Sequence, residues 1–330
     1  MGTTFKCICT KGLGMAVLLL AVLHTSAQTI YVKPNGKGDG SSWKEAYGHF
    51  STALENARPG TQIWVAAGKY NPTTGAGRDI SFSIPSGVKI YGGFEGSEKA
   101  VDERQPNIYA SILSGDIGQP GTADNSYNVV HFENADGNTL LDGFTITGGN
   151  ANGHGNDNME NSRGGGIYNN GRAGASSPVI RNCYFIKNFG RDGGAVYNDG
   201  AGGQCHPVFE NCVFIENEAG LDGGAVFNDS RNGGQCNPVF KNCIFKNNMA
   251  TYGGAICHAT DDMACELTLE KCSFTENAAY LRGGAIFSMG GKENCFVETG
   301  GSVFKGNFPD NENRAFMNAE ARGAAYQIRK

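Results

Sequence analysis

The stretch that decides the fold runs from Gly193 to Asp222 and reads GGAVYNDGAGGQCHPVFENCVFIENEAGLD. Its opening motif, Gly-Gly-small-Ile/Val-aromatic-Asn, recurs at intervals of 29 or 30 residues and also starts at Gly164, Gly223, Gly253 and Gly283. A degenerate sixth copy, NRAFMN, starts at Asn313. A second motif, Phe-x-x-Asn, lies between the copies and begins at Phe185, Phe214, Phe245, Phe274 and Phe304. Two interleaved motifs with one period predict a solenoid of stacked repeats.

Each copy breaks into three short apolar runs separated by turn residues. In the copy that begins at Gly223, the runs cover residues 223–228, 236–240 and 243–245. A helical repeat is disfavoured, because glycine weakens helices and the apolar residues do not recur with helical spacing. Three short strands per repeat, each paired with its equivalent in the next coil, predict an all-β fold, the right-handed parallel β-helix.

The turn residues predict where each coil bends. The corner between the second and third strands holds Asn182, Asn211 or Asn242, and asparagine tolerates the left-handed backbone that such a corner needs. Alternation on both sides of this corner directs the phenylalanines of the Phe-x-x-Asn motifs inward. We therefore expect these five phenylalanines to form one buried stack.

The N-terminal end of the chain has a different composition. Residues 1–27 combine Lys6 and Lys11 with the apolar run MAVLLLAVL (residues 15–23) and with small residues before Gln28. This pattern predicts a secretory signal peptide, because the apolar run is too short to cross a bilayer. The mature protein is therefore expected to be exported to the periplasm, the outer surface or the extracellular space, with no membrane-spanning segment.

Residues 28–330 are expected to form a single β-helix domain. Residues 28–61 form its N-terminal cap region, in which residues 44–58 have an amphipathic helical pattern with Phe50, Ala53, Leu54 and Ala57 on one face. A helix there would cover the open edge of the first coil, whose first strand is expected at residues 62–66. Irregular coils follow to residue 150, regular coils cover residues 164–318, and residues 319–330 are a C-terminal cap or tail.

Composition and charge narrow the function classes. Glycine accounts for 50 of the 330 residues and proline for only 10, which fits a turn-rich fold rather than collagen or a proline-rich linker. Without the two lysines of the predicted signal, the chain has 25 basic and 32 acidic residues, a net charge of −7. An acidic chain without a basic block predicts no nucleic-acid partner.

The repeat motifs resemble those of the polymorphic outer-membrane proteins, in which Gly-Gly-Ala-Ile/Val alternates with Phe-x-x-Asn. The N-terminal half is similar to bacterial secreted proteins of the pectate-lyase-like fold over residues 30–72, 84–98 and 141–153. The resemblance implies a secreted β-helix. It does not imply an activity, because such proteins include lyases, hydrolases, adhesins and uncharacterised members.

Nine cysteines follow the predicted signal, and eight of them fall into two columns. One column holds Cys205, Cys236, Cys265 and Cys295, and the other holds Cys183, Cys212, Cys243 and Cys272. No Cys-x-x-Cys pair is present, so we expect no zinc site, and we expect no other metal or cofactor. The favoured interpretation is a ladder of buried, reduced thiols. Disulfides between neighbouring coils are the alternative, because adjacent strands bring Cα atoms within disulfide range.

Stacked acidic residues provide a weaker, catalytic alternative. Asp192 and Asp222 precede the Gly-Gly of successive copies and share a column with Arg163. A lyase or a glycoside hydrolase acting on acidic polysaccharide would use such carboxylates as acids, bases or calcium ligands. The adjacent arginine favours a charge ladder instead, and Asp199 and Asp229 fit turn residues.

The first strand of each repeat carries two columns of side chains. One is strictly apolar and is expected in the core: Ile167, Val196, Val226, Ile256, Ile286 and Phe316. Alternation then turns its neighbour outward: Tyr168, Tyr197, Phe227, Cys257, Phe287 and Met317. We expect Tyr168, Tyr197, Phe227 and Phe287 to form a binding surface for sugar rings or a protein. The alternative is that these rings stack on each other or lie under the loop 151–163.

These patterns together favour an exported, non-catalytic envelope or cell-surface protein. Its expected partner is a glycan or another envelope protein, and the polysaccharide lyase or hydrolase remains the alternative function.

Overall fold

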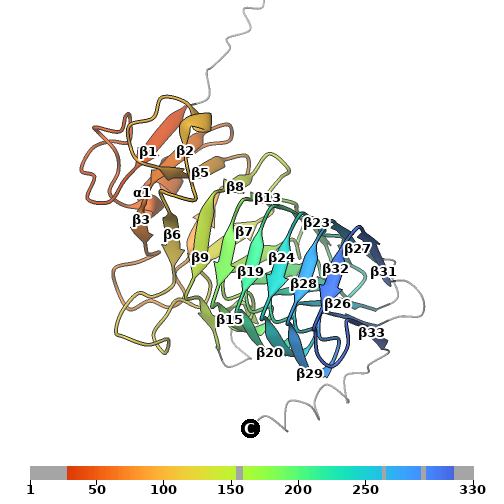
Figure 1. Cartoon of the computed structure of the whole chain (residues 1–330). Coiled ribbons are helices and arrows are strands. Elements are labelled where there is room, and N and C mark those ends of the chain that lie inside the picture. The colour runs from red at the N-terminus through yellow and green to blue at the C-terminus, as the bar shows by residue number, and fades with distance from the viewer. Residues whose placement is uncertain (1–27, 154–158, 262–264, 291–294, 316–330) are drawn as a thin grey trace, which may run out of the picture.

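The chain folds as a parallel β-solenoid, in which five sheets run along the long axis (Figure 1). The structure is a computed structural model that describes residues 28–153, 159–261, 265–290 and 295–315. The predicted signal peptide, Phe316, Met317 and residues 318–330 lie outside the described residues. Every strand pairing is parallel, so the all-β fold predicted from the repeats is confirmed.

Sheet A contains β1 (Thr29–Val32), β2 (Gln62–Ala66), β5 (Lys89–Phe94), β8 (Leu140–Asp142), β13 (Val179–Arg181), β18 (Val208–Glu210), β23 (Val239–Lys241), β27 (Cys265–Glu270) and β31 (Cys295–Gly300). Sheet B contains β3 (Gly68–Tyr70), β6 (Ser111–Ser114), β9 (Phe144–Thr147), β14 (Tyr184–Ile186), β19 (Val213–Ile215), β24 (Ile244–Lys246), β28 (Ser273–Thr275) and β32 (Val303–Lys305).

Sheet C contains β4 (Phe82–Ile84), β7 (Val130–Glu133), β11 (Ile167–Asn170), β16 (Val196–Asp199), β21 (Val226–Ser230), β26 (Ile256–Thr260), β30 (Ile286–Met289) and β33 (Glu312–Ala315). Sheet D contains β10 (Asn150–Ala151), β15 (Phe189–Asp192), β20 (Glu218–Asp222), β25 (Met249–Tyr252) and β29 (Ala278–Arg282). The short sheet E contains β12 (Ala175–Ser176), β17 (Gln204–Cys205) and β22 (Gln235–Cys236). The helices are α1 (Phe50–Asn56) and the 3-10 turns η1 (Val101–Glu103) and η2 (Met159–Ser162).

The register of the regular coils is the one that the motifs predict. Phe214 lies beside Phe245 in sheet B, and the N–H of Gly194 donates to the carbonyl of Gly223 at 3.1 Å. The corner residues Asn182, Asn211 and Asn242 have φ values of 51°, 54° and 52°, as expected for a left-handed corner. Equivalent residues of successive coils therefore stack on each other.

The interior of the solenoid is one continuous apolar core. The described members of the predicted apolar column, from Ile167 to Ile286, are fully buried. The phenylalanines of the Phe-x-x-Asn motifs stack nearly parallel, with centroid separations of 4.6, 4.7, 4.6 and 4.8 Å between Phe185, Phe214, Phe245, Phe274 and Phe304. The first four are fully buried, and Phe304 is partly buried at the C-terminal end of the stack. The predicted stack is confirmed.

The two ends of the solenoid differ from the sequence prediction. Sheet A begins before Gln62, because Thr29–Val32 pairs with Gln62–Val65 as an additional first strand. Helix α1 covers only Phe50–Asn56 and places Phe50, Ala53 and Leu54 in the core. At the other end, β33 lies four residues out of the predicted register, with Glu312 rather than Phe316 opposite Ile286. The shift follows from a shorter connection, in which Asp310 accepts a hydrogen bond from the Gly283 N–H at 3.0 Å.

Replacing Phe245 with alanine tests the central stack. The substitution removes a fully buried ring between Phe214 and Phe274, and we expect it to lower the free energy of unfolding by about 3–5 kcal/mol. Ile244→Ala is the matched control, because Ile244 is the adjacent residue of the same strand and is 43% exposed. Urea denaturation of both variants measures the difference. Small and equal losses of unfolding free energy in the two variants would show that Phe245 does not point into the core.

Candidate functional site

The aromatic column of sheet C is buried, which corrects the prediction of an open binding surface. Tyr168 is 3% exposed, and Tyr197, Phe227 and Phe287 are 0% exposed. Alternation does point these rings away from the main core, and they form a second cluster on the opposite side of sheet C. The rings stack on each other, at 5.7 Å between Tyr168 and Tyr197 and 5.0 Å between Tyr197 and Phe227. The alternative interpretation of this column, a mutual stack, is therefore the correct one.

The column is buried because the residue before each Gly-Gly pair folds back over it. The first glycine of each motif has a φ between 63° and 67°, a left-handed conformation that reverses the chain. This reversal lays the guanidinium of Arg163 4.8 Å from the ring centroid of Tyr197, and it brings the ring of Tyr252 to 5.1 Å from that of Phe287. Cation–π and aromatic contacts of this kind stabilise a covered layer.

The hydroxyl groups of this layer pair with aspartates one coil further along. Tyr168 donates to Asp199 Oδ2 at 2.6 Å, and Tyr197 donates to Asp229 Oδ2 at 2.6 Å. In the next coil the aromatic residue is Phe227, which has no hydroxyl group. One coil further along, the position that the aspartates occupy in the earlier coils holds Ala259. The aspartate is therefore present in the two coils where a buried hydroxyl needs an acceptor.

Arginine side chains complete the layer and neutralise the buried aspartates. Arg231 binds Asp229 through Nε at 2.7 Å and Nη2 at 2.6 Å, and Arg172 binds Asp199 at 3.1 Å. Burial alone would raise the pKa of Asp229, but the hydrogen bonds and charge of Arg231 outweigh it, so that its pKa is lowered. Burial and the nearby carboxylates raise the pKa of both Tyr168 and Tyr197. The tyrosines are therefore neutral donors.

Asp192 and Asp222, the alternative catalytic residues, lie inside this layer. They pair on adjacent strands of sheet D, Asp192 in β15 opposite Asp222 in β20, and are 2% and 1% exposed. Arg191 binds Asp192 with two nitrogens, at 3.1 and 2.8 Å, and Arg163 approaches the same carboxylate at 4.0 Å. A catalytic carboxylate must reach a substrate, and these two are covered by the fold itself. Asp192 therefore has the geometry of a structural ion pair, and Asp222 lies buried beside it.

The sequence analysis did not predict this layer, although two columns of the repeat carry information about it. The column that precedes the Gly-Gly pairs reads Arg163, Asp192, Asp222, Tyr252 and Arg282. A second column pairs Tyr with Asp in two coils and Phe with Ala in the third. The covariation of a hydroxyl with a carboxylate one coil away indicates that the ring is buried against the next coil.

The cysteine columns are buried, as predicted. The described cysteine side chains, which exclude that of Cys295, are at most 2% exposed, and none forms a disulfide. Burial raises the pKa of Cys183 to about 12 and holds that of Cys243 well above its ordinary value, so the reactive thiolate is suppressed. His258, in the same interior, has a pKa lowered by burial to about 4 and is neutral at pH 7. These groups pack the core rather than form a reactive centre.

The exposed surface with the most regular order is the outer side of sheet B, which we call the outer B face. Its first column contains Lys69, Ile112, Thr145, Tyr184, Val213, Ile244, Ser273 and Val303 in register. Its second column contains Thr147, Ile186, Ile215, Lys246, Thr275 and Lys305. Tyr184, Val213 and Ile244 follow one another in the first column, and Ser273 separates them from Val303. Tyr184, Ile244 and Val303 are 39%, 43% and 61% exposed, so these side chains form an apolar strip that Ser273 interrupts.

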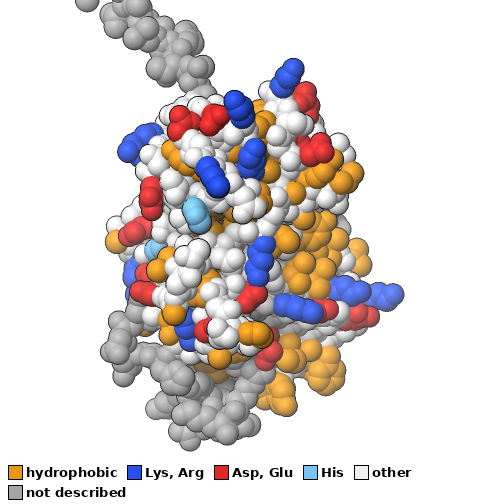
Figure 2. Space-filling view, turned by 90° about the vertical axis from the view of Figure 1, so that its left-hand side faces the viewer, with side chains coloured by type: hydrophobic (Ala, Val, Ile, Leu, Met, Phe, Trp, Pro, Cys, Tyr) orange, Lys and Arg blue, Asp and Glu red, His pale blue; other side chains and the backbone are white. Residues whose placement is uncertain are grey.

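Charged pairs border this apolar strip. Lys187 and Glu216 lie 3.4 Å apart at the corner beyond sheet B, and Lys246 of the second column lies 3.9 Å from Glu276 at that corner. Figure 2 shows hydrophobic side chains gathered on its right-hand flank, which corresponds to the front of Figure 1, with charged side chains projecting beside them. An apolar centre with a charged rim is the composition of a protein interface.

No group of three or more His, Cys, Asp and Glu side chains in the described part of the chain is arranged to hold a metal ion. No helix among the described residues is both long and apolar enough to span a membrane.

Replacing Asp229 with asparagine tests the buried ion-pair layer. At pH 7 the change leaves the Arg231 cation without its carboxylate, and we expect the free energy of unfolding to fall by about 3 kcal/mol. The lowered pKa of Asp229 means that its contribution is present above the unfolded pKa of about 4 and is lost at more acidic pH. The gap between wild type and variant should therefore narrow in urea titrations below about pH 4.

Asp116→Asn is the control for this prediction, because Asp116 pairs with Lys69 at 2.6 Å on the surface, where both side chains are about half exposed. We expect a loss of at most about 1 kcal/mol from that variant. An Asp229→Asn protein as stable as wild type at pH 7 would contradict the account of the layer.

Comparison with known proteins identifies two family models that match the chain. A repeat described as the Chlamydia polymorphic membrane protein repeat matches residues 271–289, which include one Phe-x-x-Asn motif and one Gly-Gly-Ala-Ile motif. A search of curated proteins and a search of solved structures each found no match. The second model covers residues 32–268, well over half of the chain, and is described as a protein of unknown function. The chain therefore belongs to the family of proteins of unknown function termed DUF1565.

Proposed function

We propose that this protein is an exported, non-catalytic surface protein that binds a protein partner along the outer B face. The observation that carries the proposal is the in-register apolar strip of that face, exposed at Tyr184, Ile244 and Val303. A contiguous apolar surface bordered by charges marks an interaction site on a soluble fold. The match to a polymorphic membrane protein repeat supports a role at the cell surface.

The shape of the face supports an elongated contact. Equivalent residues repeat from coil to coil at the spacing of paired strands, about 4.8 Å, so the strip extends along the long axis of the solenoid. Its exposed side chains are mostly β-branched, and Tyr184 is its only aromatic residue in the two columns. Aliphatic side chains pack well against another protein, whereas sugar rings are usually bound on aromatic rings, so a protein partner is favoured over a glycan.

The arrangement of the acidic residues supports a binding role over catalysis. Asp192 and Asp222 are buried, and the arginine contacts of Asp192 satisfy a structural role. A lyase or hydrolase would place such carboxylates against a substrate-accessible groove. The burial of these two aspartates therefore argues against the alternative function, a lyase or hydrolase that uses them as catalytic residues.

A triple variant tests the proposed face. Replacing Tyr184, Ile244 and Val303 together with serine removes the three most exposed apolar side chains of the strip while leaving the core residues unchanged. We expect binding to envelope membranes of the producing organism, measured by biolayer interferometry, to weaken by about tenfold or more. The melting temperature should stay close to that of wild type, because the replaced side chains are exposed.

The matched control is the double variant Tyr280→Ser and Leu281→Ser, which removes exposed apolar residues of sheet D, 71% and 44% exposed. This control should bind like wild type. Membranes treated with protease should lose binding, and membranes treated with periodate should keep it. Loss after periodate alone would assign the surface to a glycan, and equal binding by the triple variant and the control would rule out the outer B face.

A further inference from the structure

The first strand of sheet C has an unpaired edge at the N-terminal end of the solenoid. Among the described residues, β4 pairs only with β7, with Phe82 opposite Val130. The Phe82 N–H donates to the Val129 carbonyl at 2.9 Å, so Phe82 faces β7. In a parallel ladder, alternate residues bond to opposite neighbours. The N–H and C=O of Ser83 therefore point away from β7, toward α1.

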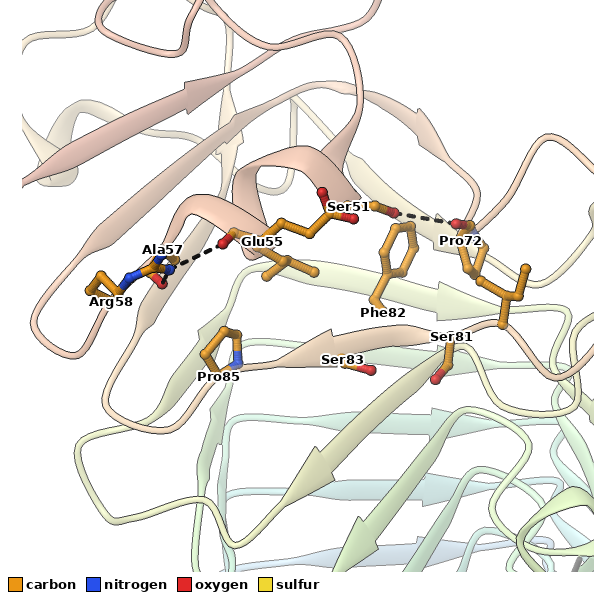
Figure 3. Close-up of a pocket in the computed structure, with 11 residues that line it drawn as sticks. Ser51, Glu55, Ala57, Arg58, Pro72, Ser81, Phe82, Ser83 and Pro85 are labelled. Carbon is orange, nitrogen blue, oxygen red and sulfur yellow. Dashed lines mark hydrogen bonds between the residues drawn. The ribbon is translucent and has the colours of Figure 1, made fainter.

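A groove lies along this edge, between β4 and α1. Its volume is about 570 Å³, within the range of binding clefts. The core residues Leu54 and Phe82, 5% and 1% exposed, form part of its wall, and Ile80 adds an apolar side chain that is 43% exposed. Pro85 closes the groove at the C-terminal end of β4, and Pro72 lies at the other end (Figure 3). The groove thus combines free backbone hydrogen-bonding groups with an apolar lining, which is the construction of a strand-addition site.

The two ends of the groove carry opposite charges. Arg58 donates through Nη1 to the carbonyls of Glu55 and Ala57, at 3.1 and 2.7 Å, and these bonds hold its side chain at the end of α1 near Pro85. The Glu55 carboxylate is turned the other way, toward Ser51 (Figure 3). The positive charge therefore lies at the end to which β4 runs, and the negative charge lies toward the end where it starts.

We propose that this groove binds the extended C-terminal segment of a partner protein, which adds to β4 as a parallel strand. In this direction the terminal carboxylate of the bound segment meets Arg58, and a basic residue a few positions before it meets Glu55. The Ser83 N–H and C=O supply two hydrogen bonds to the backbone of the bound segment. The reverse direction would place like charges together, so charge complementarity selects the parallel orientation.

This site is separate from the outer B face. The groove is built from α1 and the start of sheet C, whereas the outer B face is built from sheet B. The inference goes beyond the proposed function, and the variants that test the two surfaces have no residue in common. Either surface can fail its test while the other stands.

The first experiment uses a library of random hexapeptides with free C-termini and the full chain. Affinity selection should enrich peptides with Val, Ile or Thr at alternate positions, because these residues favour an extended strand. Amidation of an enriched peptide should weaken binding at least about tenfold in fluorescence polarisation, since it removes a charge-assisted hydrogen bond to Arg58. Arg58→Gln should weaken the free peptide similarly and abolish the effect of amidation. Lys44→Gln, at an exposed lysine outside the groove lining, should change neither.

A matched pair of variants at Ser83 tests the strand addition itself. Ser83→Ala keeps the backbone N–H and should bind the enriched peptides like wild type. Ser83→Pro removes the N–H on the groove side, a change that edge strands tolerate, and should abolish binding while the melting temperature stays near that of Ser83→Ala.

If Ser83→Pro does not fold, an enriched peptide N-methylated at the amide that pairs with the Ser83 carbonyl tests the same bond from the ligand side. N-methylation at that amide should abolish binding, and N-methylation at the next amide should not. Failure to enrich any peptide would overturn the proposal. Binding that is indifferent to Ser83→Pro and to both N-methylations would also overturn it, because contact would then not involve the edge of β4.

Discussion

A ladder of asparagine side chains at the corner between sheets B and D holds the coils in register. In its second rung, Asn217 Nδ2 donates to the Phe185 carbonyl of the preceding coil at 2.9 Å and to Asn248 Oδ1 of the following coil at 3.0 Å. Its Oδ1 accepts from the backbone N–H and from Nδ2 of Asn188, both at 3.1 Å. The donors and the acceptor of each interior amide are thereby satisfied inside the protein, which a buried amide requires. The same contacts recur along the ladder of Asn188, Asn217, Asn248, Asn277 and Asn307.

The position of every other column follows from this ladder. Phenylalanine stands three residues before each ladder asparagine, so the ladder places the rings of successive coils directly above one another. With Phe214 directed inward, its neighbours Val213 and Ile215 must point outward, and they form part of the outer B face. The regular order of the proposed binding surface is therefore a consequence of the buried asparagine and phenylalanine stacks. A change that broke the ladder would disorder the face without touching any of its side chains.

The repeat predicted the regular coils well because its period specifies which residues lie side by side. Phe214 and Phe245 could be paired from their spacing alone, and so could the corner asparagines. The aromatic column was wrongly expected to be exposed, because alternation states on which side of a strand Tyr197 lies but not what covers that side. Arg163 covers it from a column whose members change identity from coil to coil.

The ends of the solenoid were predicted less well, because they depend on irregular segments. The extra strand Thr29–Val32 has no repeat motif, and β33 reaches sheet C through a shorter connection than its predecessors. The groove beside β4 could not be predicted from sequence, since it arises where a seven-residue helix, α1, covers the core but leaves the backbone edge of the strand open. The exported character of the protein rests on residues 1–27 and stays a prediction.

The most direct test of the account is the loss of one ladder amide. Asn248→Ala leaves the Asn217 N–H and the Phe214 carbonyl without their partners inside the protein, and we expect the free energy of unfolding in urea to fall by at least about 3 kcal/mol. Asn211→Ala, at an exposed left-handed corner with one side-chain bond at 3.2 Å, should cost only about 1 kcal/mol. A loss from Asn248→Ala no greater than that from Asn211→Ala would contradict the claim that the ladder holds the coils together.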